Sequence, residues 1–403
     1  MIVSCADRKL DMVIKAPPSK SIYHRELIVR FLLGDRDHLE ALPDDSEDVI
    51  ATKGCLRALA VAKPGKDVIL PCNESGSTLR FMIPVASAYL LREDRDQGCR
   101  IIAETKGRLY DRPVEELEVA LLPHGIKIER DDDTRSIRIT GTMTSGEYVI
   151  DGSVSSQYIS GLLMALPLML HNSSVRVTGQ MKSIHYIDLT RDVLTKYGCD
   201  IPLEDGVFTI TSRGYDKELT SGFEVEGDWS NGAFLLCMSR WSDITVEGLD
   251  PASRQGDRAI VDFLNYADDP DHRASGVWDC TDTPDIAPYM AVVSAFLFDK
   301  MTLTGIGRLR IKESDRVTAV RQQLDAIGVK TSEDEDSLTV YGYKAADDSD
   351  RPIRLSSYHD HRMAMCAILI AVILKEEVDI DDIDCLNKSF PQLRSIIEKE
   401  MKP

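Results

Sequence analysis

The sequence predicts an α/β protein built from two similar halves, and three observations lead to this prediction. The chain has 403 residues, more than one hydrophobic core usually serves, so at least two domains are expected. Six apolar, helix-like stretches follow small polar residues, and their spacing in the first half recurs in the second. Short alternating segments with charged turns lie between them and are typical of strands.

The six apolar stretches are each expected to form a buried helix with a capped N-terminus. Their starting positions in the first half recur 208, 208 and 206 residues later, which predicts two homologous halves of three units each. The six positions used for this comparison are Lys20, Gly76, Ser155, Asp228, Pro284 and His361.

Three more polar helices are expected to begin near residues 114, 187 and 315. These helices are expected to end at Gly125, Gly198 and Gly328. Each glycine is followed by a short stretch in which apolar and polar residues alternate, which indicates a glycine C-cap leading into a strand. Charged turns in the segments that begin at residues 129 and 332 predict β-hairpins.

Composition and charge exclude several classes of protein. Apolar residues make up 43% and charged residues 29%, as in ordered soluble proteins. The net charge of -19 repels nucleic acid and acidic membrane surfaces, and the longest apolar run, residues 363–374, is too short to span a bilayer. Nine scattered cysteines without a CxxC pair favour a reduced, cytoplasmic setting.

Cations at two helix starts in the first half suggest anion binding. Lys20 and Arg25 lie in the first turns of a helix beside Ser21, where a cation is unfavourable unless an anion is bound. Gly76 allows close approach of backbone to a ligand, and Arg80 follows one turn later. A surface position for Lys20 and plain capping at the second start remain alternatives.

A further pair of arginines, Arg108 and Arg112, flanks a turn before an acidic helix. Arg112 has an alternative, purely structural role, because it can pair with Glu115 or Glu116.

The second half places acids among cations at its helix starts. Glu313 lies between Lys312 and Arg316, which are expected to lower its pKa and keep it ionised as a base. Asp285 is a second carboxylate at a helix start, where capping is an alternative role. Residues 360–362, Asp-His-Arg, open a very apolar helix.

No metal or organic cofactor is expected. The eight histidines form no HxxxH or HExxH pattern, and no GxGxxG follows a predicted strand. The sequence around Gly76 is not a nucleotide-binding Walker A loop.

Ten motifs, in order and spacing, resemble those of 5-enolpyruvylshikimate-3-phosphate synthases, over nearly the whole chain. They are PPSKSIYHR, ESGSTLR, GRLYDRP, SSQY, SIHYID, VEGDWSNGAF, TPDIAPYM, IKESDRV, DHRMAM and NKSFP. The resemblance implies two similar domains of three βαβαββ units with buried parallel helices, joined by a two-stranded hinge. Residues 18–225 would mainly bind shikimate 3-phosphate, and residues 1–17 and 226–403 would close and contribute phosphoenolpyruvate contacts.

The resemblance also implies an activity: transfer of the carboxyvinyl group of phosphoenolpyruvate to the 5-hydroxyl of shikimate 3-phosphate, in aromatic amino acid biosynthesis. The implied catalytic residues are Lys20, Asp285 and Glu313. The implied shikimate 3-phosphate contacts are Lys20, Ser21, Arg25, Ser155, Ser156, Gln157, Ser183, Asp285 and Lys312. The implied phosphoenolpyruvate contacts are Lys20, Gly76, Arg80, Arg108, Gln157, Arg316, Arg362 and Lys388. We expect a monomer, and glyphosate is expected to compete with phosphoenolpyruvate because Gly76 leaves room for it.

The sequence departs from the family pattern at several positions. Glu74 to Ser77 replace the usual Asn-Ala-Gly-Thr, Pro18 stands where Gly is usual, and Tyr23 where a small hydroxyl residue often occurs. Arg308 and Arg310 add positive charge without an assigned role.

Three alternatives compete with this resemblance. The related enolpyruvyl transferase that acts on a UDP-amino sugar uses a loop cysteine, whereas here Cys99 is the nearest thiol, thirteen residues before Arg112. A non-catalytic binding protein on the same scaffold would lack Asp285 and Glu313. A scaffold role within a larger protein would require an extra segment, which the chain does not contain.

Overall fold

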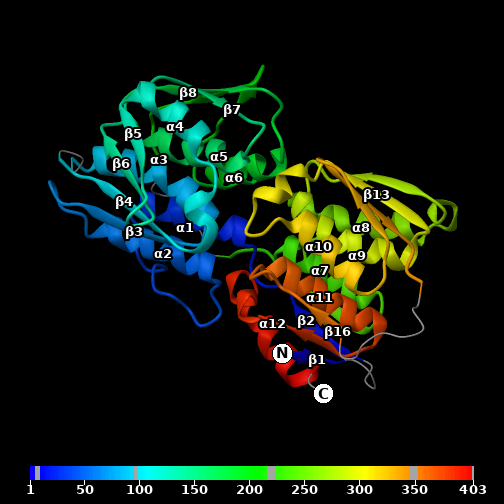
Figure 1. Cartoon of the computed structure of the whole chain (residues 1–403). Helices are drawn as coiled ribbons and strands as arrows, with labels where there is room; N and C mark the ends of the chain where they lie inside the picture. Colours follow the sequence, from blue (N-terminus) through cyan, green and yellow to red (C-terminus); the bar gives the residue numbers. More distant parts are fainter. Residues whose placement is uncertain (5–9, 95–97, 216–223, 345–352, 402–403) are drawn as a thin grey trace. The chain divides into compact units, whose positions relative to one another are not determined.

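The computed structural model describes residues 1–4, 10–94, 98–215, 224–344 and 353–401 (Figure 1). It contains α-helices and several small sheets of mixed parallel and antiparallel strands, which confirms the predicted α/β class. Among the described residues, no helix is both long and apolar enough to cross a lipid bilayer. The eight described cysteines are all free, and Cys5 lies outside the described residues.

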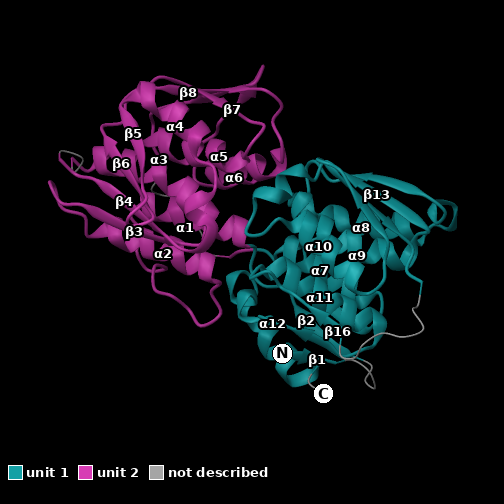
Figure 2. Cartoon of the chain, viewed as in Figure 1, with its two compact units in different colours: residues 1–19, 226–403 teal, residues 20–225 magenta. Residues whose placement is uncertain are grey.

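The chain forms two compact units, each with its own hydrophobic core (Figure 2). Unit 1 comprises residues 1–19 and 226–403, and unit 2 comprises residues 20–225. The chain therefore passes from one unit to the other twice. An isolated antiparallel bridge between Pro18 and Gly227, both in unit 1, lies next to these two crossings.

One six-element pattern, βαβαββ, occurs three times among the described residues. In each copy the first two strands are parallel, the second pairs antiparallel with the fourth, and the fourth pairs antiparallel with the third. The first copy in unit 2 is β3 (Val68–Asn73), α3 (Gly76–Arg92), β4 (Ile101–Thr105), α4 (Glu115–Leu121), β5 (Ile126–Asp131) and β6 (Ser136–Gly141). The second is β7 (Glu147–Asp151), α5 (Ser156–Ala165), β8 (Ser173–Thr178), α6 (Ile184–Lys196), β9 (Leu203–Glu204) and β10 (Val207–Ile210). The copy in unit 1 is β12 (Gly276–Asp279), α9 (Ala287–Leu297), β13 (Lys300–Thr304), α10 (Arg316–Ala326), β14 (Thr331–Glu333) and β15 (Ser337–Tyr341).

The remaining elements form partial copies. In unit 1, β2 (Asp11–Lys15) pairs in parallel with β11 (Asp243–Glu247), next to α7 (Trp229–Ser239) and α8 (Ala259–Asp268). β16 (Ile353–Leu355), α11 (His361–Leu374), β17 (Val378–Ile380) and α12 (Pro391–Glu400) follow, and β1 (Ile2–Val3) pairs with β17. Unit 2 begins with α1 (Lys20–Leu32) and α2 (Glu47–Ala60). Residues 20–60, all described, contain no strand, and the first described strand of unit 2 is β3.

Capping explains where several buried helices begin. The Ser75 and Ser155 hydroxyls accept backbone N–H bonds at the starts of α3 and α5, and the Asp228 and Asp360 carboxylates do so for α7 and α11. The predicted capped start at Thr283 was wrong: its side chain makes no cap bond, and a 3-10 turn, η6 (Pro284–Ile286), precedes α9.

The glycine C-caps and the hairpins are confirmed. Gly125, Gly198 and Gly328 have φ angles of +85°, +77° and +82°, a left-handed conformation that glycine adopts without steric cost. Gly125 leads into the hairpin β5–β6 and Gly328 into the hairpin β14–β15, and both strand pairs are antiparallel as predicted. The amphipathic helices α4, α6 and α10 end just before these glycines.

Candidate active site

In unit 2, the starts of four helices lie together. The Lys20 ammonium group, on α1, is 2.8 Å from a carboxylate oxygen of Asp48 on α2. The Thr78 hydroxyl, on α3, donates to the Asp48 carbonyl at 3.3 Å, and the Gln157 amide, on α5, donates to the Ser77 hydroxyl at 2.7 Å. Lys20 and Gln157, two of the predicted site residues, are thus connected in this unit through Asp48 and the start of α3.

Arg25 is a buried cation whose hydrogen bonds all go to neutral oxygen atoms. Its guanidinium group donates to the Thr190 hydroxyl at 2.6 Å, to the carbonyls of Ser21 and Tyr186 at 2.5 and 2.9 Å, and to the Ser160 hydroxyl at 3.3 Å. No carboxylate in the described residues forms an ion pair with it. Burial lowers the pKa of Arg25 to about 10, so the group remains charged at neutral pH. A buried charge of this kind favours an anionic ligand.

Arg80 and Arg112 form a second positive cluster in unit 2. Arg80 donates to the Gln157 side-chain oxygen at 2.8 Å and to the Pro113 carbonyl at 3.0 Å. The Nε atoms of Arg80 and Arg112 are buried, and neither has a hydrogen-bond partner in the described part of the chain. Burial, followed by repulsion from Arg112, lowers the pKa of Arg80 to about 10. A bound anion would relieve both costs.

Arg112 is the residue that the sequence analysis left out of the candidate site. Its alternative role, an ion pair with Glu115 or Glu116, is not what the described residues show, because Glu115 pairs with Arg130 at 2.9 Å instead. A side chain at Gly76 would place its Cβ atom 2.5 Å from Arg112 Nη1, so the two positions are in direct contact. Arg108, which the sequence analysis preferred, is exposed on the 3-10 turn η1 (Gly107–Asp111).

The serines selected from the sequence lie at helix starts in the same unit. Ser155 caps α5, Ser156 is buried in its first turn, and Ser183 precedes α6 with a left-handed φ of +53°. Such a φ is uncommon outside glycine and is frequent at binding sites.

In unit 1, the candidate site is organised around one buried arginine. Arg316, in the first turn of α10, is 2.9 Å from a carboxylate oxygen of Asp285 and 2.8 Å from one of Asp360, and it also pairs closely with Glu313. Its guanidinium group therefore binds three carboxylates from three segments of the unit. These acids raise the pKa of Arg316 well above its usual value against the opposing effect of burial.

Two lysines complete this cluster. Lys312 is 3.1 Å from Asp285, and Lys388, on the 3-10 turn η8 (Asp384–Lys388), is 3.6 Å from Glu313. Burial would raise the pKa of Asp285, but Lys312 and Arg316, with Arg362, hold it well below its usual range. The capping alternative for Asp285 was wrong, because its carboxylate binds cations and makes no cap bond.

Arg362 lies beside this cluster in the first turn of α11. It donates to the Ser230 carbonyl and the Tyr289 hydroxyl, both at 2.9 Å, and to the Ser230 hydroxyl. Its Nε atom is buried without a hydrogen-bond partner among the described residues. Arg362 thus joins Arg80 and Arg112 as a buried guanidinium whose Nε atom is left to bind an anion.

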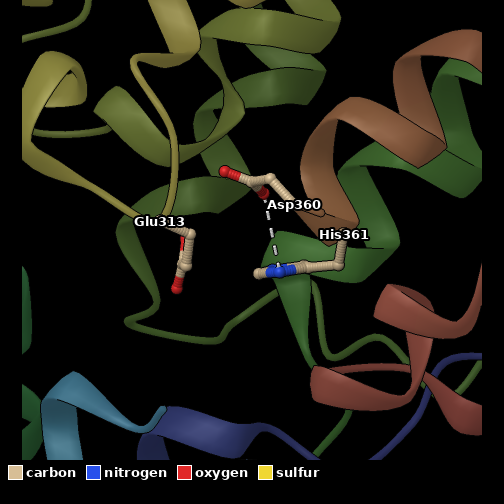
Figure 3. A group of neighbouring side chains, drawn as sticks. All are labelled: Glu313, Asp360 and His361. Atoms are coloured by element: carbon tan, nitrogen blue, oxygen red, sulfur yellow. Dashed lines mark ion pairs between the residues drawn. The ribbon is translucent and has the colours of Figure 1, made fainter. Parts of the chain in front are cut away.

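Glu313, Asp360 and His361 approach one another closely enough to resemble a metal site (Figure 3). One ligand atom from each lies within 4.8 Å of the others. However, Arg316 pairs with both carboxylates and Lys388 approaches Glu313, so side-chain cations already balance their charge. We therefore assign no metal to this cluster. Asp360 and His361 were noted in the sequence as a charged helix start, but their contact with Glu313 was not expected.

Comparisons with family models, curated sequences and solved structures all point to the same family. The family model for EPSP synthase (3-phosphoshikimate 1-carboxyvinyltransferase) matches residues 6–397. A 3-phosphoshikimate 1-carboxyvinyltransferase from Clostridium beijerinckii is 31% identical over 95% of this chain and 94% of the relative, and one from Clostridium kluyveri is 32% identical over 96% and 95%. The solved EPSP synthase structure from Acinetobacter baumannii shares the fold, with a TM-score of 0.71 and 18% identity over 99% of this chain and 98% of that one. The resemblance found in the sequence is confirmed, and the chain belongs to the EPSP synthase (3-phosphoshikimate 1-carboxyvinyltransferase) family.

Proposed function

We propose that this protein is a 3-phosphoshikimate 1-carboxyvinyltransferase, which transfers the carboxyvinyl group of phosphoenolpyruvate to shikimate 3-phosphate and releases phosphate. Family membership over residues 6–397 supports the activity. The observation that carries the proposal is the pair of carboxylates, Asp285 and Glu313, held on the single buried guanidinium of Arg316. A protein that only bound anions would need the cations, whereas proton transfer requires acids and bases as well.

In unit 2, we assign anion binding to the buried arginines. Arg25, with the serines at the starts of α5 and α6, would hold shikimate 3-phosphate, because its cation has only neutral partners in the part of the chain that the structure describes. Arg80 and Arg112, with Lys20 and Gly76, would hold phosphoenolpyruvate. We assign Arg112 to this role in place of Arg108, because Arg112 is buried against Gly76 and Arg108 is exposed.

In unit 1, we assign Arg316, Arg362 and Lys388 to phosphoenolpyruvate and Lys312 with Asp285 to shikimate 3-phosphate. The 5-hydroxyl oxygen attacks C2 of phosphoenolpyruvate and loses its proton while C3 gains one, which gives a tetrahedral ketal. Phosphate then leaves as C3 gives up a proton and the double bond re-forms. Asp285 and Glu313 exchange these protons and Lys20 acts as an acid, each contributing about a hundred- to ten-thousandfold.

The test is release of inorganic phosphate from phosphoenolpyruvate, measured with and without shikimate 3-phosphate and without added metal or nucleotide. Release should require both substrates. Glu313→Gln, which keeps the size of the side chain and removes its charge, should lower kcat by about a hundredfold or more. Glu333→Gln is the matched control. Glu333, on β14, pairs with Arg310 and Arg321 and lies outside the cluster at Arg316.

Other outcomes point to the alternatives. Phosphate release only with a UDP-amino sugar would identify the related transferase. Tight binding of phosphoenolpyruvate without any phosphate release would indicate a binding protein. We also propose a cytoplasmic monomer, for which light scattering of the purified protein should give the mass of one 44.9 kDa chain.

A further inference from the structure

Two consecutive residues with unfavourable backbone conformation precede α11. Tyr358 and His359 have φ angles of +53° and +54°. Elsewhere in the described residues, non-glycine residues with positive φ occur singly. A left-handed conformation crowds Cβ against the carbonyl oxygen, and tyrosine is not among the residues that adopt it readily. Asp360, which caps α11, follows directly, so the conformation of this pair determines where the helix begins.

The strained pair is held by a short network of hydrogen bonds. The Tyr358 N–H donates to the Ser356 hydroxyl at 3.1 Å, and the His359 N–H donates to the Ser357 hydroxyl at 3.2 Å. The Ser356 hydroxyl in turn donates to Asp381 at 2.5 Å, and the Ser357 N–H donates to the same carboxylate at 2.8 Å. Because the Ser356 hydroxyl donates its only proton to Asp381, its oxygen is free to accept the bond from the Tyr358 N–H.

The sheet explains why these segments meet. β16 and β17 are parallel, with Leu355 opposite Ile380, so the residues that follow each strand emerge side by side. Asp381 also accepts a bond from the Asp382 N–H, and Asp382 accepts one from the Asp384 N–H at the start of η8. The turn after β17 thus touches both the entry to α11, which bears Arg362, and the entry to η8, which bears Lys388.

We propose that Asp381, an exposed residue outside the cluster at Arg316, is a positioning residue that sets Arg362 and Lys388 for phosphoenolpyruvate. This inference rests on the proposed function for the identity of the ligand. The structural effect does not depend on the proposed function, because Asp381 holds the strained pair whether or not a substrate is bound.

The first experiment measures hydrogen–deuterium exchange in the protein without substrate. Asp381→Asn keeps the size of the side chain but loses the charge and one of the two acceptor oxygens, so amides of residues 357–363 and 384–388 should exchange at least about tenfold faster. Asp334→Asn is the matched control, because Asp334 likewise accepts bonds from a serine hydroxyl, Ser337, and a backbone N–H, that of Asp336. Unchanged exchange in both segments of Asp381→Asn would overturn the inference whatever the activity of the protein.

The second experiment measures phosphate release. Asp381→Asn should raise KM for phosphoenolpyruvate about tenfold or more and leave KM for shikimate 3-phosphate within about twofold, because displacing a binding group by about 1 Å can cost up to a hundredfold. A merely less stable protein would show a lower active fraction with both KM values unchanged, and that result would refute a positioning role. A wild-type protein that releases no phosphate would instead refute the proposed function, and the exchange result would still decide the role of Asp381.

A rescue variant tests the cause. His359→Gly alone also removes the 2.8 Å contact between the His359 ring and Asp382, so its own KM for phosphoenolpyruvate and its own exchange rates are the reference for the double variant. In the Asp381→Asn background it should recover most of the lost affinity for phosphoenolpyruvate and much of the protection in residues 357–363, because glycine adopts a positive φ without steric cost. Absence of any recovery in both measurements would show that backbone strain at this pair is not what Asp381 opposes.

Discussion

Replacement of Gly76 by alanine tests the contact between the start of α3 and Arg112. The added Cβ atom would lie 2.5 Å from Nη1, 2.8 Å from Cζ and 3.0 Å from Nη2 of Arg112. Ordinary contacts between such atoms begin near 3.4 Å, so the guanidinium group must retreat by roughly 1 Å. The movement is feasible because these atoms form the end of a flexible side chain, so we expect the protein to fold normally.

The displacement should appear in the affinity for phosphoenolpyruvate. A misplacement of about 1 Å can cost up to a hundredfold, so KM for phosphoenolpyruvate should rise about ten- to hundredfold, equivalent to roughly 1.4 to 2.7 kcal/mol. Steady-state phosphate release at saturating shikimate 3-phosphate measures this change. Gly54→Ala is the control, because its Cβ atom would press on the ring of Pro71 at 3.0 Å in the same unit without touching Arg112.

A double-mutant cycle isolates the cause. Arg112→Met removes the guanidinium group at similar volume, so adding Gly76→Ala to it should change KM for phosphoenolpyruvate by less than about twofold. The coupling energy would then be about 1 to 2.7 kcal/mol, within the range for residues in contact. If Gly76→Ala costs as much in the Arg112→Met background as in the wild type, the alanine acts by another route and the reasoning from this contact is refuted.

Two further predictions concern single residues. Arg112→Met should raise KM for phosphoenolpyruvate at least about tenfold, whereas Arg108→Met should change it less than about threefold. The reason is that the Arg112 guanidinium is buried and the Arg108 guanidinium is exposed. Equal effects of the two substitutions in kinetic assays would contradict our assignment. Burial, followed by the Asp285 carboxylate, raises the pKa of Asp257 from 3.8 to about 6. The folded state then holds this proton more tightly than the unfolded state, so stability is lost as pH rises through this interval. Relative to Asp257→Asn, the free energy of unfolding of the wild type should fall by about 2 kcal/mol between pH 4 and pH 7 in urea titrations, and parallel curves would disprove the shift.

Features that depend on the local chain were predictable from the sequence. Gly125, Gly198 and Gly328 end their helices because only the residues next to them decide whether a left-handed C-cap forms. The charged turns of β5–β6 and β14–β15 are equally local. The starts of α3, α5, α7 and α11 follow from capping side chains within three residues.

Contacts between distant segments were not predictable in the same way. An ion pair of Arg112 with Glu115 or Glu116 was an alternative because these residues are close in sequence, yet Glu115 pairs with Arg130 on β5. The role of Asp360 as a partner of Arg316, 44 residues away, depends on how α10 and α11 pack. A chain with several carboxylates at comparable separations offers no local signal that distinguishes these pairings, so geometry is needed to choose among them.

The balance of charge differs between three buried arginines of unit 2 and Arg316 of unit 1, and this difference suggests different tasks. In unit 2, the hydrogen bonds of Arg25 and Arg80 go to neutral groups, and neither these two arginines nor Arg112 forms an ion pair with a carboxylate in the described residues, although the chain carries a net charge of -19. Uncompensated buried cations store an electrostatic cost that a phosphate or carboxylate ligand removes, so they favour binding. In unit 1, three carboxylates already surround Arg316. A ligand anion must compete with these acids for the guanidinium, and its negative charge would favour their protonated forms. Substrate binding at Arg316 would in this way be coupled to the protonation state of the acids that we assign to catalysis.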